Sequence, residues 1–496
     1  MSETDNLKLA TARTLKWNLV DRFGQQVMYA VTGIVLARLL SQEDFGLVGA
    51  ILIFQAFASL LIDSGFSYAL LQRKQPTRLD YSTVLWFNIA LAVFIYVTLW
   101  FCAVPIADIF KGDMRLVPLS RAMFLTFILN ATAIVQTNRL MKRMDVKMIA
   151  VSNIAGLAVG AVAGIWLAVS GYGAWAIVWQ SISAAAIKSI ILWTTGHWFP
   201  MLKFSWKALR SYFSVGSSMM LTSFLNTLFQ KIYSFFIGNK AGLIPLGYYT
   251  QSEKWSTMGI SSIMQVLTAS FLPVMSHVQD DPERFRRIAS KTDRFTCYIL
   301  FPCVAALTIT APQIFHILFG IKWDASIPLF QLLLARGIFS VLMSNYNNFI
   351  ISLGKTRTVL YLEVIRDVTA LGALIATLPM MSLETAHDIV YGIKIMLYGQ
   401  IAASAIAWCA SLVATTAVTG IGLYTLLRDM IPYGCITLAM SAAMIFIPEA
   451  SSDTATLLIR LAAGATIYIA LNFLGKSRIQ SDVWEYISYR FCKKNT

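Results

Sequence analysis

Long apolar segments recur along nearly the whole chain, and each is about as long as a bilayer-spanning helix, which needs roughly 20 residues. Of the 496 residues, 57% are hydrophobic and only 13% are charged, whereas soluble domains average about 25% charged residues. A membrane β-barrel would instead show shorter segments of alternating polarity. The sequence therefore predicts an all-α, polytopic membrane protein.

Counting these segments predicts about fourteen transmembrane helices. They lie near residues 14–37, 45–70, 81–106, 117–138, 148–170, 173–195, 210–238, 246–275, 294–318, 326–352, 358–379, 391–419, 430–447 and 456–474.

A weak internal repeat groups the segments into lobes. Residues 37–47 and 238–248 both end one helix, turn briefly and begin the next with an apolar-Gly-apolar sequence. Six segments then repeat in the same orientation, so that a pseudo-symmetry axis along the membrane normal relates the two halves. In such proteins the substrate chamber is expected between the halves. We expect an N-terminal lobe at 1–205, a C-terminal lobe at 206–425, and two further helices with a cytoplasmic tail at 426–496.

The basic residues alternate between the two sides of the predicted membrane. One set of loops and tails carries about 26 Lys and Arg and the opposite set carries six, and an excess of basic residues marks the cytoplasmic side. Both termini are therefore expected to be cytoplasmic. Because the net charge of +15 is concentrated in these short loops, it does not indicate a nucleic-acid partner.

Polar residues recur at helical spacing inside the first two segments. They are Asn18, Arg22, Gln25, Tyr29 and Gly33 in the first, and Gln55, Ser59, Asp63 and Ser67 in the second. A charge in the hydrocarbon costs roughly 2.5–3.5 kcal/mol on insertion scales, so Arg22 is expected to face a helix bundle or a wet cavity. An Arg22–Asp63 ion pair that simply joins two helices is an alternative interpretation.

Other charged residues lie within later apolar segments. The cations are Lys188, Lys231, Lys254, Arg336 and Arg366, and the acids are Asp21, Glu253, Glu363 and Asp367. Unpaired cations that face a cavity would suit an anionic substrate such as a phosphate. Internal ion pairs are the competing interpretation, and Glu363 is placed to bond Arg366 on one helix face. Asp63, Glu253 and Glu363 are candidate protonation sites or structural partners.

Catalytic and metal-binding motifs are missing from the sequence. The four histidines are scattered, and there is no HExxH, GxSxG or Walker A sequence. The cysteines form no CxxC pair that would indicate a zinc site. We therefore expect no metal, no cofactor and no enzymatic activity, with energy supplied by an ion gradient, the membrane potential or the substrate gradient.

The opening third of the chain resembles bacterial polysaccharide transporters. The matching sequences are ARLLSQEDFGL at 37–47, Phe54, DSGF at 63–66 and ALLQR at 69–73. Transporters of this type belong to the multidrug/oligosaccharidyl-lipid/polysaccharide (MOP) flippase superfamily, and the expected span count, repeat and termini fit over essentially the full length.

The resemblance implies a flippase for an oligosaccharide linked to undecaprenyl diphosphate, working by alternating access in the bacterial inner membrane. The resemblance also implies a cationic chamber that holds the diphosphate or acidic sugars. Arg22, Lys231 and Lys254 correspond to its lining positions, while Arg336 and Arg366 are added on their polarity alone. The implied partners are the lipid-linked oligosaccharide, membrane lipids and, as candidates, a polysaccharide polymerase and a chain-length regulator. The product would be lipopolysaccharide O-antigen or an exopolysaccharide.

Three alternatives are open at this point. A lipid II flippase would bind a peptide-bearing substrate and is not distinguished by charge. A cation-exporting antiporter of the same superfamily would favour an acidic chamber, which the cationic balance opposes. A polymerase or ligase would need a large periplasmic loop, whereas the longest outer loop, near 379–391, has only about a dozen residues.

Overall fold

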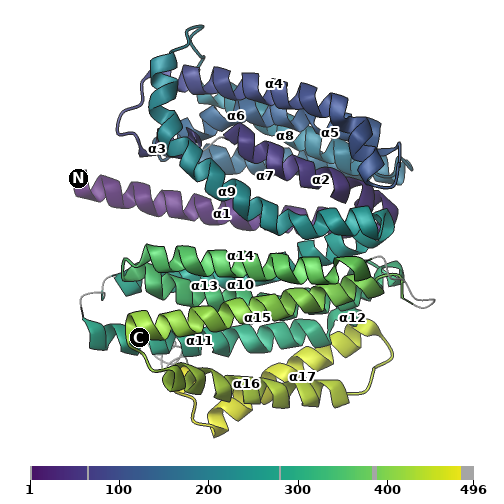
Figure 1. The fold of residues 1–496 in the computed structure, drawn as a ribbon, viewed down its shortest axis with the longest axis vertical. Helices are drawn as coiled ribbons and strands as arrows, with labels where there is room; N and C mark the ends of the chain where they lie inside the picture. The colour runs from purple at the N-terminus through teal and green to yellow at the C-terminus, as the bar shows by residue number, and fades with distance from the viewer. Residues whose placement is uncertain (1–2, 64–65, 277, 279–280, 382–387, 482–496) are drawn as a thin grey trace, which may run out of the picture. The chain divides into compact units, whose positions relative to one another are not determined.

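The computed structural model describes residues 3–63, 66–276, 278, 281–381 and 388–481. These residues form two compact units, residues 1–247 and 248–496. Both units are built from α-helices, which run alongside one another within each unit (Figure 1). The prediction of an all-α fold is therefore confirmed.

The first unit contains nine complete helices and the first turn of a tenth among its described residues. Their bounds are α1 Glu3–Leu39, α2 Gln42–Asp63, α3 Phe66–Gln72, α4 Arg78–Ile109, α5 Leu116–Met123, α6 Leu125–Lys142, α7 Val146–Val169, α8 Trp175–Gly196, α9 Trp206–Lys240 and α10 Leu243–Ser276.

The second unit continues from α10 and ends in a helical hairpin. Its remaining elements are α11 Pro282–Ile309, α12 Ala311–Leu318, η1 Ile321–Trp323, α13 Ser326–Ser352, α14 Thr356–Thr377, η2 Leu378–Met380, α15 Tyr391–Thr419, α16 Leu423–Phe446 and α17 Asp453–Leu474.

Ten helical segments of the described chain are long and apolar enough to cross a membrane. Each predicted segment overlaps a long helix, but α1, α9, α10 and α14 are outside that set of ten. These four helices carry Arg22, Lys231, Lys254 and Arg366. The protein is thus a multi-pass membrane protein, while the exact number of fourteen spans stays a prediction.

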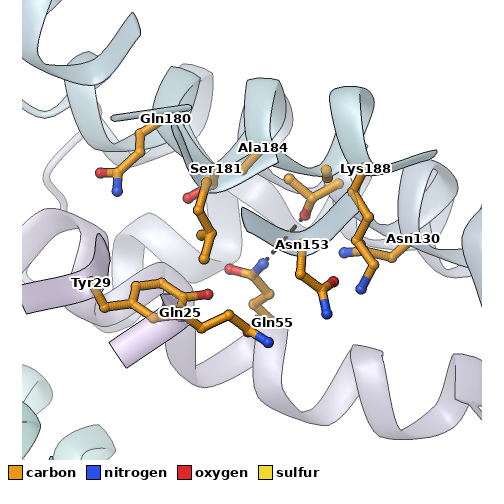
Figure 2. A pocket seen from close by; sticks show the side chains of 12 residues that line it. Gln25, Tyr29, Gln55, Asn130, Asn153, Gln180, Ser181, Ala184 and Lys188 are labelled. Carbon is orange, nitrogen blue, oxygen red and sulfur yellow. Dashed lines mark hydrogen bonds between the residues drawn. The ribbon is translucent and has the colours of Figure 1, made fainter. Parts of the chain in front are cut away.

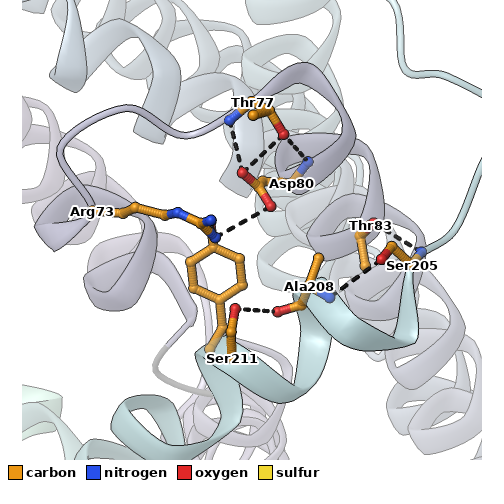
Figure 3. Close-up of polar contacts among 8 residues, drawn as sticks. Arg73, Thr77, Asp80, Thr83, Ser205, Ala208 and Ser211 are labelled. Carbon is orange, nitrogen blue, oxygen red and sulfur yellow. Dashed lines mark hydrogen bonds and ion pairs between the residues drawn. The ribbon is translucent and has the colours of Figure 1, made fainter.

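The boundary between the compact units differs from the lobe boundary expected at 205/206. Helix α9 belongs to the first unit because it packs against α2, α3 and α4. Polar contacts hold its beginning in place. The backbone N–H of Ser205 donates to Thr83 Oγ1 at 3.2 Å (Figure 3). Arg73 Nη1 donates to the Tyr212 hydroxyl at 2.8 Å. The division into two pseudo-equivalent lobes stays a prediction.

The start of α4 explains why Arg73 is well placed for this contact. Thr77 caps the helix by accepting from the backbone N–H of Asp80, and the Asp80 carboxylate accepts in return from the Thr77 backbone (Figure 3), which is a capping box. The second Asp80 oxygen lies 3.3 Å from Arg73 Nη1. The cap therefore orients the arginine that contacts α9.

A glycine stripe on α7 allows close approach of α8. Gly156, Gly160 and Gly164 recur every fourth residue, and a Cβ at Gly160 would lie 2.6 Å from the backbone oxygen of Gln180. Small residues at this spacing let membrane helices pack backbone to backbone. The stripe thereby fixes which face of α8 meets the rest of the first unit.

Candidate functional site

A polar cavity of about 250 Å³ lies entirely within the first unit. Its walls come from α1, α2, α6, α7 and α8 (Figure 2). The lining side chains are Gln25, Tyr29, Gln55, Thr126, Asn130, Asn153, Leu157, Gln180, Ser181, Ala184, Ala185 and Lys188. Five of these side chains are carboxamides, which both donate and accept hydrogen bonds.

Close packing of α7 on α8 brings two of these side chains together. A Cβ at Gly156 would lie 3.3 Å from the Lys188 Cβ and 2.6 Å from the Ala184 backbone oxygen. Asn153, one turn before Gly156, is therefore held close to Lys188, and Figure 2 shows both side chains at the cavity.

A hydrogen-bond network connects α1 to α7 beside the cavity. Asp21 accepts from Gln25 Nε2 at 2.8 Å and from Asn153 Nδ2 at 3.1 Å. The carboxylate thus orients two amides of the cavity wall. On α2, Gln55 Nε2 donates to Thr126 Oγ1 at 3.3 Å, while Gln55 Oε1 has no partner among the described residues.

Lys188 also lines a second cavity, of about 550 Å³, in the same unit. This cavity shares Lys188 and Asn130 with the first one, and its remaining wall comes from residues of α2, α3 and α6. In the part of the chain that the structure describes, the Lys188 ammonium makes no hydrogen bond or ion pair; the charged group that acts on it electrostatically is Asp21. An ammonium therefore stands at the junction of two cavities inside a membrane unit.

The polar stripes predicted from the sequence contribute to both cavities. Gln25 and Tyr29 of the first segment and Gln55 of the second line the smaller cavity. Ser59 and Ser67 line the larger one. The Asp63 side chain lies outside the described side chains, and so does the proposed Arg22–Asp63 pair.

The five cations predicted to bind the substrate are not among the residues that line these two cavities. Arg22 on α1 is exposed and Lys231 on α9 is half-buried, and neither is among the residues lining either cavity. In the second unit, Lys254 is exposed, with its Nζ 5.6 Å from the centre of the Trp255 ring, and Glu253 is half-buried.

Arg366 is held by carboxylates of its own helix. Its guanidinium forms an ion pair with Glu363 and a second with Asp367, whose Oδ1 lies 2.9 Å from Nη2. Glu363 also accepts from Asn347 Nδ2 at 3.2 Å. This local pairing is the structural interpretation that the i,i+3 spacing suggested.

Arg336 has a different environment on α13. Its Nη1 donates to Gln400 Oε1 on α15 at 3.3 Å, and its buried Nε has no hydrogen-bond partner among the described residues. Among the described residues, its side-chain hydrogen-bond partner is therefore a neutral amide. Within the described chain, no group of three or more His, Cys, Asp or Glu is arranged to hold a metal ion.

Most residues that line the smaller cavity are not among the polar residues that the sequence predicts to be functional. The sequence singles out Lys188 as a lone cation, but not Asn130, Asn153 or Gln180. These three residues share a feature that the sequence does contain: each is a carboxamide within an apolar segment. Asn153 also lies one helical turn before the glycine stripe.

Comparison with known proteins gives the family. Residues 35–328, more than half of the chain, match the family described as polysaccharide biosynthesis protein. The chain belongs to this family. The predicted relationship to bacterial polysaccharide transporters is thereby confirmed.

Curated relatives of this polysaccharide biosynthesis family member cover most of the chain. The succinoglycan biosynthesis transport protein ExoT of Rhizobium meliloti is 25% identical over 75% of each chain. The teichuronic acid biosynthesis protein TuaB of Bacillus subtilis is 24% identical over 70% of this chain and 72% of the relative. The lipopolysaccharide biosynthesis protein WzxC of Escherichia coli is 23% identical over 67% of this chain and 68% of the relative.

Solved structures agree on the fold of this family member. A lipid II flippase MurJ in an inward closed conformation has a TM-score of 0.73 at 11% identity, covering 94% of this chain and all of that one. An inward-facing MATE transporter of the MOP superfamily has a TM-score of 0.60 at 16% identity. The match covers 80% of this chain and 96% of that one. The chain therefore has the MOP transporter fold that the sequence predicted.

Proposed function

We propose that this protein is a flippase that moves a lipid-linked oligosaccharide repeat unit across the bacterial inner membrane. The unit would be carried on undecaprenyl diphosphate, taken up at the cytoplasmic leaflet and released at the periplasmic leaflet by alternating access. Its product would serve lipopolysaccharide O-antigen or exopolysaccharide biosynthesis. Both termini would be cytoplasmic, and a polymerase and a chain-length regulator would act on the delivered unit.

The observation that carries this proposal is a polar, carboxamide-lined cavity inside a membrane unit of a polysaccharide biosynthesis family member. Carboxamides pair well with sugar hydroxyls, since both groups donate and accept hydrogen bonds. Such a cavity offers few apolar contacts that would bind an apolar drug. The likeness to a lipid II flippase supports a common fold. At 11% identity it does not support transport of lipid II by this chain.

Within this proposal the diphosphate would be bound by cations that lie outside the two cavities. Arg22, Lys231, Lys254 and Arg336 are the candidates, because arginine binds phosphate bidentately and lysine supplies a point charge. The sequence places Arg366 with them, but its two carboxylate partners favour a structural role. Glu253, Glu363 and Asp63 are candidates for carrying a coupling proton.

The test is reconstitution of the purified protein in proteoliposomes with a synthetic undecaprenyl-diphosphate oligosaccharide. Transfer between leaflets is followed by an impermeant lectin or quencher that detects only the outer population. We expect protein-dependent transfer, and loss of transfer in Arg22→Gln, Lys231→Gln and Lys254→Gln proteins that still insert. Unchanged transfer in the triple variant would refute the assignment of these cations, and absence of transfer by the wild type would refute the function.

Lipid II serves as the competing substrate in the same assay. Transfer of lipid II in preference to the oligosaccharide carrier would move the proposal to peptidoglycan synthesis. Polymer export in a strain lacking the gene provides the matching cellular measurement, with accumulation of the undecaprenyl-linked unit in the inner leaflet as the expected result.

A further inference from the structure

The irregular segment between α8 and α9, residues 197–205, exposes large apolar side chains. Phe199 is 68% exposed, Leu202 is 91% exposed, and Trp206, the first residue of α9, is 75% exposed. Exposure of this much apolar surface to water is unfavourable. Clustered exposed apolar side chains therefore mark a surface that contacts a partner or a membrane.

Side chains of α4 satisfy the backbone of this segment. Arg78 Nη2 donates to the Phe199 carbonyl oxygen at 2.9 Å. Trp86 Nε1 donates to the Met201 carbonyl oxygen at 2.9 Å, and the Met201 N–H donates to Ser82 Oγ at 2.9 Å. Where water is scarce, as in a membrane, backbone polar groups must find their partners within the protein. The segment meets this requirement along the first turns of α4, a membrane-spanning helix.

Cations accompany these apolar side chains, and acids do not. Lys203, Lys207 and Arg210 are all exposed. The sequence contains no Asp or Glu from residue 146 to residue 252. Lysine and arginine beside a membrane-spanning helix attract the anionic lipids of the cytoplasmic leaflet, and tryptophan favours the same interfacial depth. The surface therefore complements anionic headgroups that lie above acyl chains.

An arginine cluster lies beside the same segment. The Arg139 guanidinium lies 4.7 Å from the centre of the Trp198 ring, and its Nη1 donates to the neutral Gln136 Oε1 at 3.0 Å. Arg78 and Arg143 are the other cations that act on Arg139 electrostatically. In the described part of the chain, none of these three arginines forms an ion pair with a carboxylate. Arginine binds phosphate oxygens bidentately, so the cluster adds to the attraction for a phosphate headgroup.

A protein partner is the competing occupant of an exposed apolar surface. Lysine is depleted at the core of protein interfaces, whereas Lys203 and Lys207 each directly follow an exposed apolar residue, Leu202 and Trp206. A lysine stem can lie along an apolar layer while its ammonium reaches the charged groups above it. This alternation favours a lipid surface over a protein one.

We propose that residues 197–210 form a docking surface for anionic phospholipids of the cytoplasmic leaflet. The exposed apolar side chains lie among the upper acyl chains, and Lys203, Lys207 and Arg210 contact the headgroup phosphates. Because the segment is fixed to α4 and continues into α9, bound lipid holds the start of α9 at the membrane surface. This inference uses the proposed orientation of the chain but not the flippase function.

The experiment attaches a fluorescent label to Leu202→Cys in a cysteine-free full-length chain, reconstituted in phosphatidylcholine vesicles. Brominated phosphatidylcholine or brominated phosphatidylglycerol is then included in increasing mole fraction, because bromine quenches only a label that lies within the bilayer. We expect both lipids to quench this label and aqueous iodide to quench it weakly. We expect half-maximal quenching at a lower mole fraction of the phosphatidylglycerol than of the phosphatidylcholine.

Charge removal tests the contribution of the lysines. In the labelled chain, Lys203→Gln with Lys207→Gln should raise the required mole fraction of brominated phosphatidylglycerol about fivefold or more, the effect of losing about 1 kcal/mol. Quenching by brominated phosphatidylcholine should stay unchanged. Lys203→Arg with Lys207→Arg keeps both charges and should keep the preference.

Two matched controls separate the surface from the rest of the chain. Lys355→Gln with Arg357→Gln removes two exposed cations of the second unit and should leave the preference for phosphatidylglycerol unchanged. The same label at Lys74→Cys, in the exposed loop between α3 and α4, should be quenched by iodide and not by brominated lipid. This second control shows that the label does not enter the bilayer by itself.

Several outcomes would overturn the proposal. Quenching of the Leu202→Cys label by iodide alone would place the segment in water. Quenching by neither iodide nor lipid would show that a second copy of the chain covers it. Equal half-maximal mole fractions of the two lipids, or an unchanged preference after loss of both lysines, would remove the anionic selection. Displacement of phosphatidylglycerol by undecaprenyl diphosphate at a far lower mole fraction would assign the surface to the lipid carrier.

Discussion

His316 Nδ1 lies 3.3 Å from Asp453 Oδ2, so α12 is joined to the first turn of α17. The other ring nitrogen, Nε2, lies 3.0 Å from Asp324 Oδ1 after η1. The two ring nitrogens thus face two carboxylates, one in the loop after η1 and one at the start of α17.

We predict that His316→Gln weakens the attachment of α17 to the rest of the second unit. All three side chains are partly exposed, so the expected loss is small, about 0.2–1 kcal/mol per ion pair. Thermal unfolding in detergent at fixed low salt measures it. A double-mutant cycle with Asp453→Asn isolates the pair, and strictly additive effects of the two changes would contradict the contact.

A second prediction concerns the glycine stripe that shapes the cavity. Gly160→Ala places a Cβ 2.6 Å from a backbone oxygen of α8, so the helices must separate. We expect destabilisation of about 1–3 kcal/mol, typical of overpacking, and reduced transport. Gly372→Ala on α14 is the matched control, since the added Cβ would have open space within 4 Å of it. Equal stability of the two variants would contradict close α7–α8 packing.

The third prediction distinguishes a structural from a substrate-binding Arg366. Arg366→Gln leaves the Glu363 and Asp367 carboxylates without their cation, and we expect lower stability. Because these side chains are partly exposed, the loss should be smaller than the about 3–5 kcal/mol of a fully buried pair. Adding Glu363→Gln and Asp367→Asn should restore stability. Glu363→Gln alone is the control for a role of this carboxylate in export. If that variant exports normally, restored stability without export in the triple variant would place Arg366 at the substrate.

The fourth prediction is a pH dependence at the loop between α4 and α5. The Arg115 guanidinium, 2.6 Å from Asp113, lowers the pKa of that carboxyl below its usual value. A lowered pKa stabilises the fold above the pKa of the unfolded chain, and this contribution disappears as pH falls through the folded value. Asp113→Asn should remove this part of the acid sensitivity of thermal unfolding while Asp145→Asn, at a different loop, should retain it.

The fifth prediction tests the proposed orientation by cysteine labelling in a cysteine-free background. Ala241 would be a natural choice from the sequence, but its side chain is only 6% exposed. Met114, which is 58% exposed, and the exposed Lys74 are better positions. In intact spheroplasts the periplasmic face of the inner membrane is accessible, so we expect an impermeant thiol reagent to label Met114→Cys. We expect the reagent to label Lys74→Cys only after the membrane is permeabilised. The opposite pattern would reverse the topology.

The sequence alone determined the class of structure and much of its local geometry. Long apolar segments require helices in a bilayer, because backbone polar groups must be satisfied within the segment. Residue spacing likewise predicted the Glu363–Arg366 pair, since partners three positions apart meet on one helix face. The polar stripes of the first two segments were also found on cavity walls.

Only the tertiary structure decided which polar residues share a cavity. Gln25, Gln55, Asn153 and Lys188 lie on four helices, and they converge because the α7 glycine stripe brings α8 close and Asp21 joins α1 to α7. Helical periodicity specifies the face on which a side chain lies but not the neighbour that this face meets. Because the sequence does not specify these neighbours, it pointed to cations such as Arg366, which two carboxylates pair in the structure. The amides that share a cavity with Lys188 are brought together only by the packing of the helices.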